Sequence, residues 1–100
     1  MSIRLDALVL KILSSNKMHG HQIISELKDQ SDSFFNLQTG TVYPLLHSLE
    51  KRGLISSHTA LISNRERKVY SITQAGTAYL DSEILKWHDY CHAVEKIISK

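Results

Sequence analysis

The sequence predicts a mainly α-helical fold of the α+β class, with three short helices, a two-stranded β-hairpin and one long C-terminal helix. Apolar residues recur at steps of three and four in four separate segments, which is the spacing of helices that bury one face. Between the third and fourth segments the pattern changes to short β-branched and aromatic stretches, which are typical of strands. The chain has 100 residues, of which 42% are hydrophobic, and this suits a single modest core.

The first two helices are expected to be short and joined by a turn. Residues 14–17 interrupt the first apolar stripe with side chains that favour turns. Gly20 marks the start of a second helix, which should end between residues 29 and 33. The apolar stripes are Leu5, Leu8, Val9, Ile12 and Leu13 in the first helix, and Ile23, Ile24 and Leu27 in the second.

The third helix has recognisable ends. The hydroxyl of Thr39 is suited to cap its first turn. Lys51 and Arg52 complement the negative end of the helix dipole, and Gly53 is placed to take the left-handed conformation that ends many helices. The apolar anchors are expected to be Phe34, Phe35 and Leu37 in the preceding connection, and Val42, Leu45, Leu46 and Leu49 in the helix itself.

Residues 54–58 and 68–72 are predicted to form a two-stranded hairpin around the polar residues 63–66. Two strands alone are only marginally stable, so this hairpin must pack on the helices.

The last helix is expected to begin at a Thr73 cap and to run to about Ile98. Its apolar residues are spaced alternately by four and three, which is the a/d pattern of a coiled coil. We therefore expect residues 1–73 to form one domain and residues 74–100 to form a helix that pairs with a second copy of the chain. The alternative is a helix that folds back on its own domain. The expected dimerisation residues are Leu80, Ile84, Trp87, Cys91, Val94 and Ile98.

The charge distribution indicates a polyanionic partner for the middle of the chain. The net charge is only +2, but residues 33–72 carry five basic side chains against two glutamates. Three helices followed by a hairpin, with cations on the third helix and the hairpin, is the layout of a winged helix-turn-helix that binds double-stranded DNA. The residues expected at DNA are Gln38, Thr39, Thr41, Tyr43, His47, Lys51 and Arg52 on the helix, and Arg65, Arg67 and Lys68 on the hairpin.

Three stretches resemble the PadR family of bacterial transcriptional regulators: HGHQII at 19–24, GTVYPLLHSLEKRGLI at 40–55 and YSITQAG at 70–76. The resemblance covers nearly the whole chain and is most specific in its central stretch. It implies a winged helix-turn-helix with the third helix as the reader and the hairpin as the wing. The chain departs from the family pattern at His21, where tyrosine is usual, at Val69, where an aromatic residue is common, and at the wing tip, which lacks glycine and proline.

With a single C-terminal helix, the chain resembles the short PadR subclass. Some members of that subclass respond to planar aromatic or multidrug ligands. That resemblance implies a homodimeric repressor, with half-sites about 34–36 Å apart on a pseudo-palindromic operator. Trp87 is then a candidate for lining an effector cavity between subunits, and the alternative is that it only fills the helix seam.

Other functional classes fit less well. The sequence has neither a phosphate-binding glycine loop nor a nucleophile elbow, so an enzyme is not expected, and no cofactor is implied. His88 and His92 lie four apart beside Cys91, a spacing that suits zinc or copper but fixes no complete ligand set. Cys91 fits a small buried hydrophobe better than a redox sensor. A winged-helix adaptor that binds protein rather than DNA is a further alternative. With neither a signal peptide nor a membrane-length apolar run, we expect a cytoplasmic protein.

Overall fold

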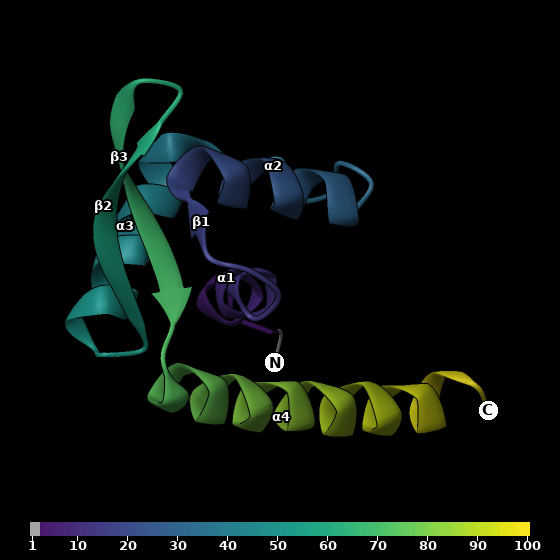
Figure 1. Cartoon of the computed structure of the whole chain (residues 1–100). Coiled ribbons are helices and arrows are strands. Elements are labelled where there is room, and N and C mark those ends of the chain that lie inside the picture. Colours follow the sequence, from purple (N-terminus) through teal and green to yellow (C-terminus); the bar gives the residue numbers. More distant parts are fainter. Residues whose placement is uncertain (1–2) are drawn as a thin grey trace.

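The computed structural model describes residues 3–100 and confirms the α+β architecture (Figure 1). Residues 1 and 2, which begin the expected first domain, lie outside the described residues. Helix α1 lies between α2 and α4, and the sheet and α3 complete the domain on one side (Figure 1). In chain order the elements are α1 (Leu5–Leu13), β1 (Met18–His19), α2 (Gly20–Gln30), α3 (Thr39–Lys51), β2 (Ile55–Ile62), β3 (Arg65–Ile72) and α4 (Gln74–Ile98).

The core is built around α1, which contacts α2, α3, α4 and β3. The expected stripe is only partly right, because Ala7 and Leu10 are fully buried while Leu5 and Leu8 are half-buried. Leu5 and Leu8 instead line an apolar groove between α1 and α4. The fully buried core side chains of the other helices are Ile23, Val42, Leu46 and Leu49.

The sheet has three antiparallel strands in the order β1-β3-β2. The expected two-stranded hairpin is confirmed as β2 and β3, and β1 adds a third strand that the sequence analysis did not predict. Met18 pairs with Tyr70, and His19 pairs with Val69. The pairing ties the segment before α2 to the wing. It provides the support that a lone hairpin would lack.

The wing is longer and its turn tighter than expected. Ile62 pairs with Arg65, so only Ser63 and Asn64 form the turn. Both have positive φ, 53° and 64°, which matches the type I′ turn that suits the twist of a hairpin. Asparagine tolerates this conformation better than most residues, which explains a tight turn without glycine.

Helix α3 begins one residue earlier than expected and ends as expected. Gln38, not Thr39, is the N-cap residue, and no side chain caps this end. At the other end Gly53 has a φ of 75°. The amide of Leu54 donates to the Leu49 carbonyl and that of Gly53 to the Glu50 carbonyl, both at 3.0 Å, which is the Schellman arrangement.

Helix α4 begins at the expected cap, where the Gly76 amide donates to Thr73 Oγ1 at 3.0 Å. Its first half packs against α1, with Leu80 buried in the core. Its second half extends past the domain (Figure 1), and Ile97 and Ile98 are 71% and 67% exposed. The helix therefore packs on its own domain with one half only.

The connection from α2 to α3 is anchored by two of the three expected residues. Phe35 and Leu37 pack against the core, whereas Phe34 is 81% exposed. The prediction for Phe34 was wrong because its ring lies edge-on against Phe35, with centroids 5.0 Å apart, on the outer side of the core.

Candidate nucleic-acid interface

Helix α3 has one buried apolar face and one exposed polar face. Val42, Leu46 and Leu49 are fully buried. The polar side chains on the other side therefore project away from the core. The exposed residues include all of the helix residues that the sequence analysis placed at DNA: Gln38, Thr39, Thr41, Tyr43, His47, Lys51 and Arg52.

Tyr43 is held against the start of α2. A Cβ atom placed on Gly20 would lie 2.3 Å from the Tyr43 hydroxyl oxygen, so the ring crosses α2 where only glycine leaves room. The His21 ring meets Tyr43 edge-on, with centroids 6.2 Å apart. The position of Tyr43 on the exposed face is thus defined by two residues of the preceding helix.

The wing carries the cations that the sequence placed there, and one of them is paired. Arg65 is exposed and Arg67 is half-buried. Lys68 Nζ lies 3.4 Å from Glu50 Oε1 near the end of α3. Glu50 also accepts a hydrogen bond from Ser57 on β2, so this carboxylate links α3 to both long strands.

Electrostatics around Glu50 favour its charged form. The pKa of Glu50 is lowered from the ordinary 4.5. The hydrogen bond from Ser57 is the largest cause, and the charges of Lys68 and His47 act in the same direction, while burial opposes them. The link between helix and wing is therefore ionic at neutral pH.

Arg52 is paired with a buried carboxylate, which it shares with Arg4. Its guanidinium is 3.1 Å from the carboxylate of Asp6 and 5.0 Å from the centre of the Tyr79 ring. Asp6 is the buried charged residue that the sequence analysis did not single out. The sequence signal that could have indicated this buried charge is an acidic residue in a mainly apolar helical segment.

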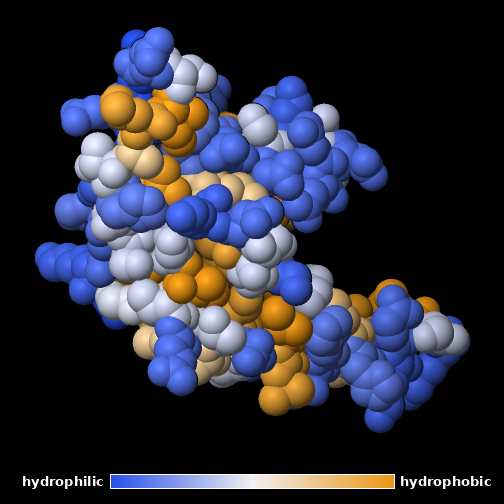
Figure 2. All heavy atoms as spheres, in the orientation of Figure 1, coloured by the Kyte–Doolittle hydropathy of each residue, from blue (hydrophilic) through white to orange (hydrophobic). Residues whose placement is uncertain are grey.

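An apolar groove of about 790 Å³ runs between α1 and α4. Figure 2 shows hydrophobic residues reaching the surface where the N-terminal part of the chain meets α4. Trp87 lies in this groove and stacks on Tyr90, with ring centroids 5.8 Å apart. The other lining residues are Ile3, Leu5, Ala7, Leu8, Lys11, Phe34, Phe35, Leu80, Ile84 and His88.

The expected seam of α4 is only partly covered within one chain. Leu80 is buried, Ile84, Trp87, Cys91 and Val94 are half-buried, and Ile98 is exposed. The seam thus changes from a buried residue at Leu80 to an exposed one at Ile98.

The alternatives based on metal binding have no site in the described chain. Among residues 3–100, no three His, Cys, Asp or Glu side chains are grouped so that they could hold a metal ion. His88, Cys91 and His92 share a helix without forming such a group. Over the same residues, no helix is long and apolar enough to span a bilayer.

Residues 9–82 match the Transcriptional regulator PadR-like family. The chain is similar to the transcriptional regulator Rv3488 of Mycobacterium tuberculosis, at 35% identity over 75% of this chain and 67% of the relative. It is also similar to the negative transcriptional regulator PadR of Bacillus subtilis, at 25% identity over 78% of this chain and 43% of that protein.

Solved structures of PadR family regulators have the same fold as this chain. A PadR-like regulator from Bacillus cereus superposes with a TM-score of 0.84 at 26% identity, covering 96% of this chain and 92% of the other. A PadR family regulator from Clostridium difficile gives 0.81 at 26% identity, covering 96% and 98%. These four proteins are transcriptional regulators, and this chain belongs to the PadR-like family of transcriptional regulators.

Proposed function

We propose that this chain is a repressor that binds a pseudo-palindromic operator as a homodimer, with α3 in the major groove and the wing against the adjacent phosphates. One observation carries the proposal: the exposed polar face of α3 adjoins the cationic wing, and Glu50 ties the two together. A groove-reading helix needs an exposed polar face, and the flanking phosphates need cations.

Each exposed residue then has a role set by its chemistry. The Gln38 amide suits adenine and the Thr41 methyl suits thymine, so these two read bases. Lys51, Arg65 and Arg67 contact phosphates, and Lys68 does so from its pair with Glu50. Arg52 is left out of this set because Asp6 and Tyr79 engage its guanidinium. The remaining contacts with groove or backbone come from Thr39, Tyr43 and His47.

The proposed dimer forms through α4, with residues 1–73 as the DNA-binding unit of each subunit and 74–100 as the dimerisation helix. The half-buried seam residues and the exposed C-terminal turns support this, because a single helix projecting past its domain leaves apolar side chains in water. Repression is supported by the relative from Bacillus subtilis, which is a negative regulator. The proposed DNA target also supports a cytoplasmic location, which is part of this proposal.

Sedimentation equilibrium tests the dimer. Val94→Glu puts a charge into the seam and should weaken dimerisation by at least about tenfold, since burying an unpaired charge is costly. His92→Glu places the same charge at an exposed neighbouring position and serves as the control. Equal effects of the two substitutions, or a monomeric wild-type protein, would rule out the proposed helix pairing.

The groove at Trp87 is the proposed effector site, for a flat aromatic ligand buried between apolar walls. A cavity with these walls and a tryptophan stacked on a tyrosine suits such a ligand. Trp87 is the only tryptophan of the chain, so its fluorescence reports on this groove alone. Saturable quenching by planar cationic dyes supports the site, and no response across a broad dye panel means that Trp87 only fills the seam.

Selection of bound fragments from genomic DNA tests the regulatory function. The proposal expects enrichment of fragments that share a pseudo-palindrome with half-sites about 34–36 Å apart. Fragments without a common motif, or none retained at any salt concentration, would favour the winged-helix adaptor.

A further inference from the structure

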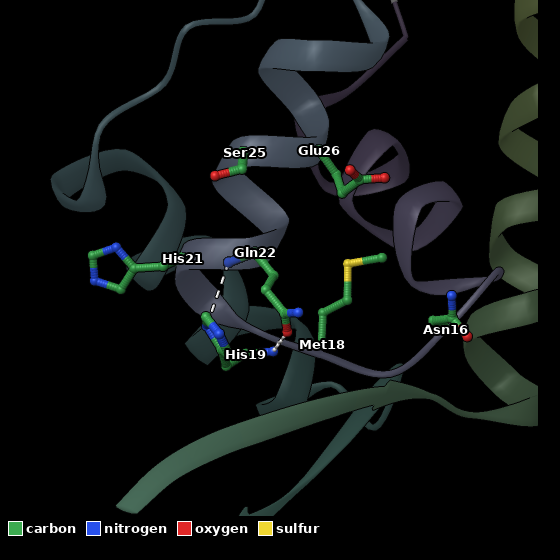
Figure 3. Close-up of a pocket in the computed structure, with 7 residues that line it drawn as sticks. All are labelled: Asn16, Met18, His19, His21, Gln22, Ser25 and Glu26. Carbon is green, nitrogen blue, oxygen red and sulfur yellow. Dashed lines mark hydrogen bonds between the residues drawn. The ribbon is translucent and has the colours of Figure 1, made fainter. Parts of the chain in front are cut away.

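Two histidines at the start of α2 line three surface hollows, two of which lie beside the wing. His19 and His21 border one hollow of about 610 Å³ together with Arg65 and Arg67, and a second of about 320 Å³ together with Tyr43 and Arg67. The third, of about 390 Å³, lies on the α2 side of the same histidines (Figure 3). Both wing-side hollows thus lie between the start of α2 and the wing, and the smaller one is also bordered by Tyr43 of α3.

The hydrogen bonding of His19 determines which ring nitrogen carries its proton. Nδ1 accepts a hydrogen bond from the Gln22 amide at 3.4 Å, and the Gln22 side-chain oxygen accepts one from the His19 amide at 3.1 Å (Figure 3). Because Nδ1 is an acceptor, the neutral ring carries its proton on Nε2. His19 therefore caps α2 with one nitrogen and has a free donor at the other.

Strand register places Arg67 on the same side of the sheet as His19. His19 pairs with Val69, and antiparallel partners project to one face, as do alternate residues along a strand. Arg67 is two residues from Val69. Burial first, and then the charges of Arg67 and His21, lower the pKa of His19 below 6.5, so these side chains are close enough to influence one another.

The charge balance of the wing-side hollows favours an anion. Their described lining holds two histidines and three basic side chains, of which Lys68 is paired with Glu50. The one carboxylate in that lining is Glu66, which precedes Arg67 on β3. A hollow lined by imidazole N–H donors and a guanidinium suits the oxygens of a phosphate group.

We propose that His19, His21 and Arg67 form a binding site for one phosphodiester group of the DNA backbone, at the junction of α2 and the wing. The inference rests on the proposed DNA-binding function and adds α2 to the interface. Arg67 supplies the charge, His19 donates from Nε2 as a neutral group, and His21 donates from the exposed side. Tyr43 connects the site to the groove-reading helix, since its ring lies against both Gly20 and His21.

Fluorescence anisotropy with an operator fragment tests the site through substitutions that differ in charge. His19→Ser keeps an N-cap oxygen for the Gln22 amide and should weaken binding about three- to tenfold, as expected for one lost hydrogen bond, with an unchanged salt slope. Arg67→Gln should weaken binding at least as much and lower the salt slope by about one per subunit. Glu66→Gln should tighten binding about two- to fivefold, because it removes the opposing charge.

Control variants separate this site from general loss of charge or fold. Lys28→Gln removes a cation from the far end of α2, and His92→Ser removes an imidazole from α4, and neither should change the affinity by more than about twofold. Thermal unfolding monitored by circular dichroism should show that His19→Ser retains the fold. Wild-type binding to DNA combined with unchanged affinity in His19→Ser and Arg67→Gln would overturn this site and leave the proposed function intact. Absence of wild-type binding at any salt would overturn both.

Histidine-detected ¹H–¹⁵N NMR gives an independent readout. The free protein should show His19 as the Nε2–H form, and operator DNA should shift the Nε2 resonance of His19. Inorganic phosphate at high concentration should shift it in the same direction but more weakly. Shifts with inorganic phosphate and none with DNA would assign the site to free phosphate and overturn the proposal, as would an Nδ1–H form of His19.

Discussion

The guanidinium of Arg52, at the C-cap of α3, lies 3.1 Å from the carboxylate of Asp6 in α1. The same carboxylate oxygen accepts a hydrogen bond from the Tyr79 hydroxyl of α4 at 3.2 Å. Asp6 is 3% exposed, and its other oxygen has no partner among the described residues. One buried charge therefore joins the proposed reading helix, the central helix and the proposed dimerisation helix.

Asp6→Asn should destabilise the fold by about 1–3 kcal/mol. The substitution keeps the shape of the side chain but replaces charged hydrogen bonds to Arg52 and Tyr79 with weaker ones. The loss should be smaller than for a fully buried pair, because Arg52 is partly exposed. Urea unfolding at one fixed protein concentration measures the loss. Asp29→Asn, at an exposed position on α2, should change the stability by less than about 0.5 kcal/mol.

The contribution of Asp6 should also depend on pH. Burial alone would raise the pKa of Asp6, but the hydrogen bond from Arg52, the charge of Arg4 and the hydrogen bonds from Tyr79 and the Ala7 amide together lower it below 3.8. A lowered folded-state pKa means that the stabilisation is present above the unfolded value and is lost as pH falls through the folded value. The stability difference between wild type and Asp6→Asn should be constant from pH 7 to 5 and narrow below about pH 4. A difference that stays the same at pH 3 would argue against an ionised Asp6 in the folded state.

Gly76→Ala should be strongly destabilising. A Cβ atom at Gly76 would lie 2.0 Å from the Leu54 carbonyl oxygen, and that oxygen accepts the Thr73 amide hydrogen bond. Backbone cannot rotate away as a side chain can, so α4 must shift, at a cost of about 1–3 kcal/mol or more. Gly40→Ala is the matched control, because its Cβ meets nothing within 4 Å in α3, and it should be neutral or stabilising by up to about 1 kcal/mol. Similar thermal midpoints for the two variants would contradict the close approach of α4 to Leu54.

Gly20→Ala should weaken DNA binding through Tyr43. The added methyl group occupies the space of the Tyr43 hydroxyl, so the ring must leave its place on the exposed face of α3. We expect Gly20→Ala and Tyr43→Ala to reduce operator affinity by similar factors, and the double variant to be no worse than Tyr43→Ala alone. Such non-additivity is the sign of a shared mechanism. Additive losses in anisotropy titrations would show that the two residues act independently.

Much of the fold follows from local patterns in the sequence. The Gly53 cap, the Thr73 cap and the limits of α4 depend on residues within a few positions of one another, and the structure confirms each of them. The sequence predicts the wing turn within residues 63–66. It does not predict that the turn has only two residues, because Ser63 and Asn64 lack the glycine that usually marks such a turn.

The features that were missed depend on contacts between distant residues. Strand β1 has two residues, and it exists because Met18 and His19 meet Val69 and Tyr70. The Asp6–Tyr79 hydrogen bond joins residues 73 positions apart, so no spacing rule indicates it. The exposed face of α3 was predictable because helical periodicity defines it, whereas the pairing of Arg52 away from that face was not.

The salt dependence of operator binding tests the central claim most directly. If the α3 face and the wing of each subunit contact DNA phosphates, a plot of log affinity against log salt concentration should be steep and linear, with a slope of about −0.9 for each phosphate contacted. Substituting alanine for both Arg65 and Arg67 should flatten this slope by about two per subunit and weaken binding to all sequences. An unchanged slope in that variant would contradict the wing assignment, and no duplex binding by the wild-type protein at low salt would contradict the account as a whole.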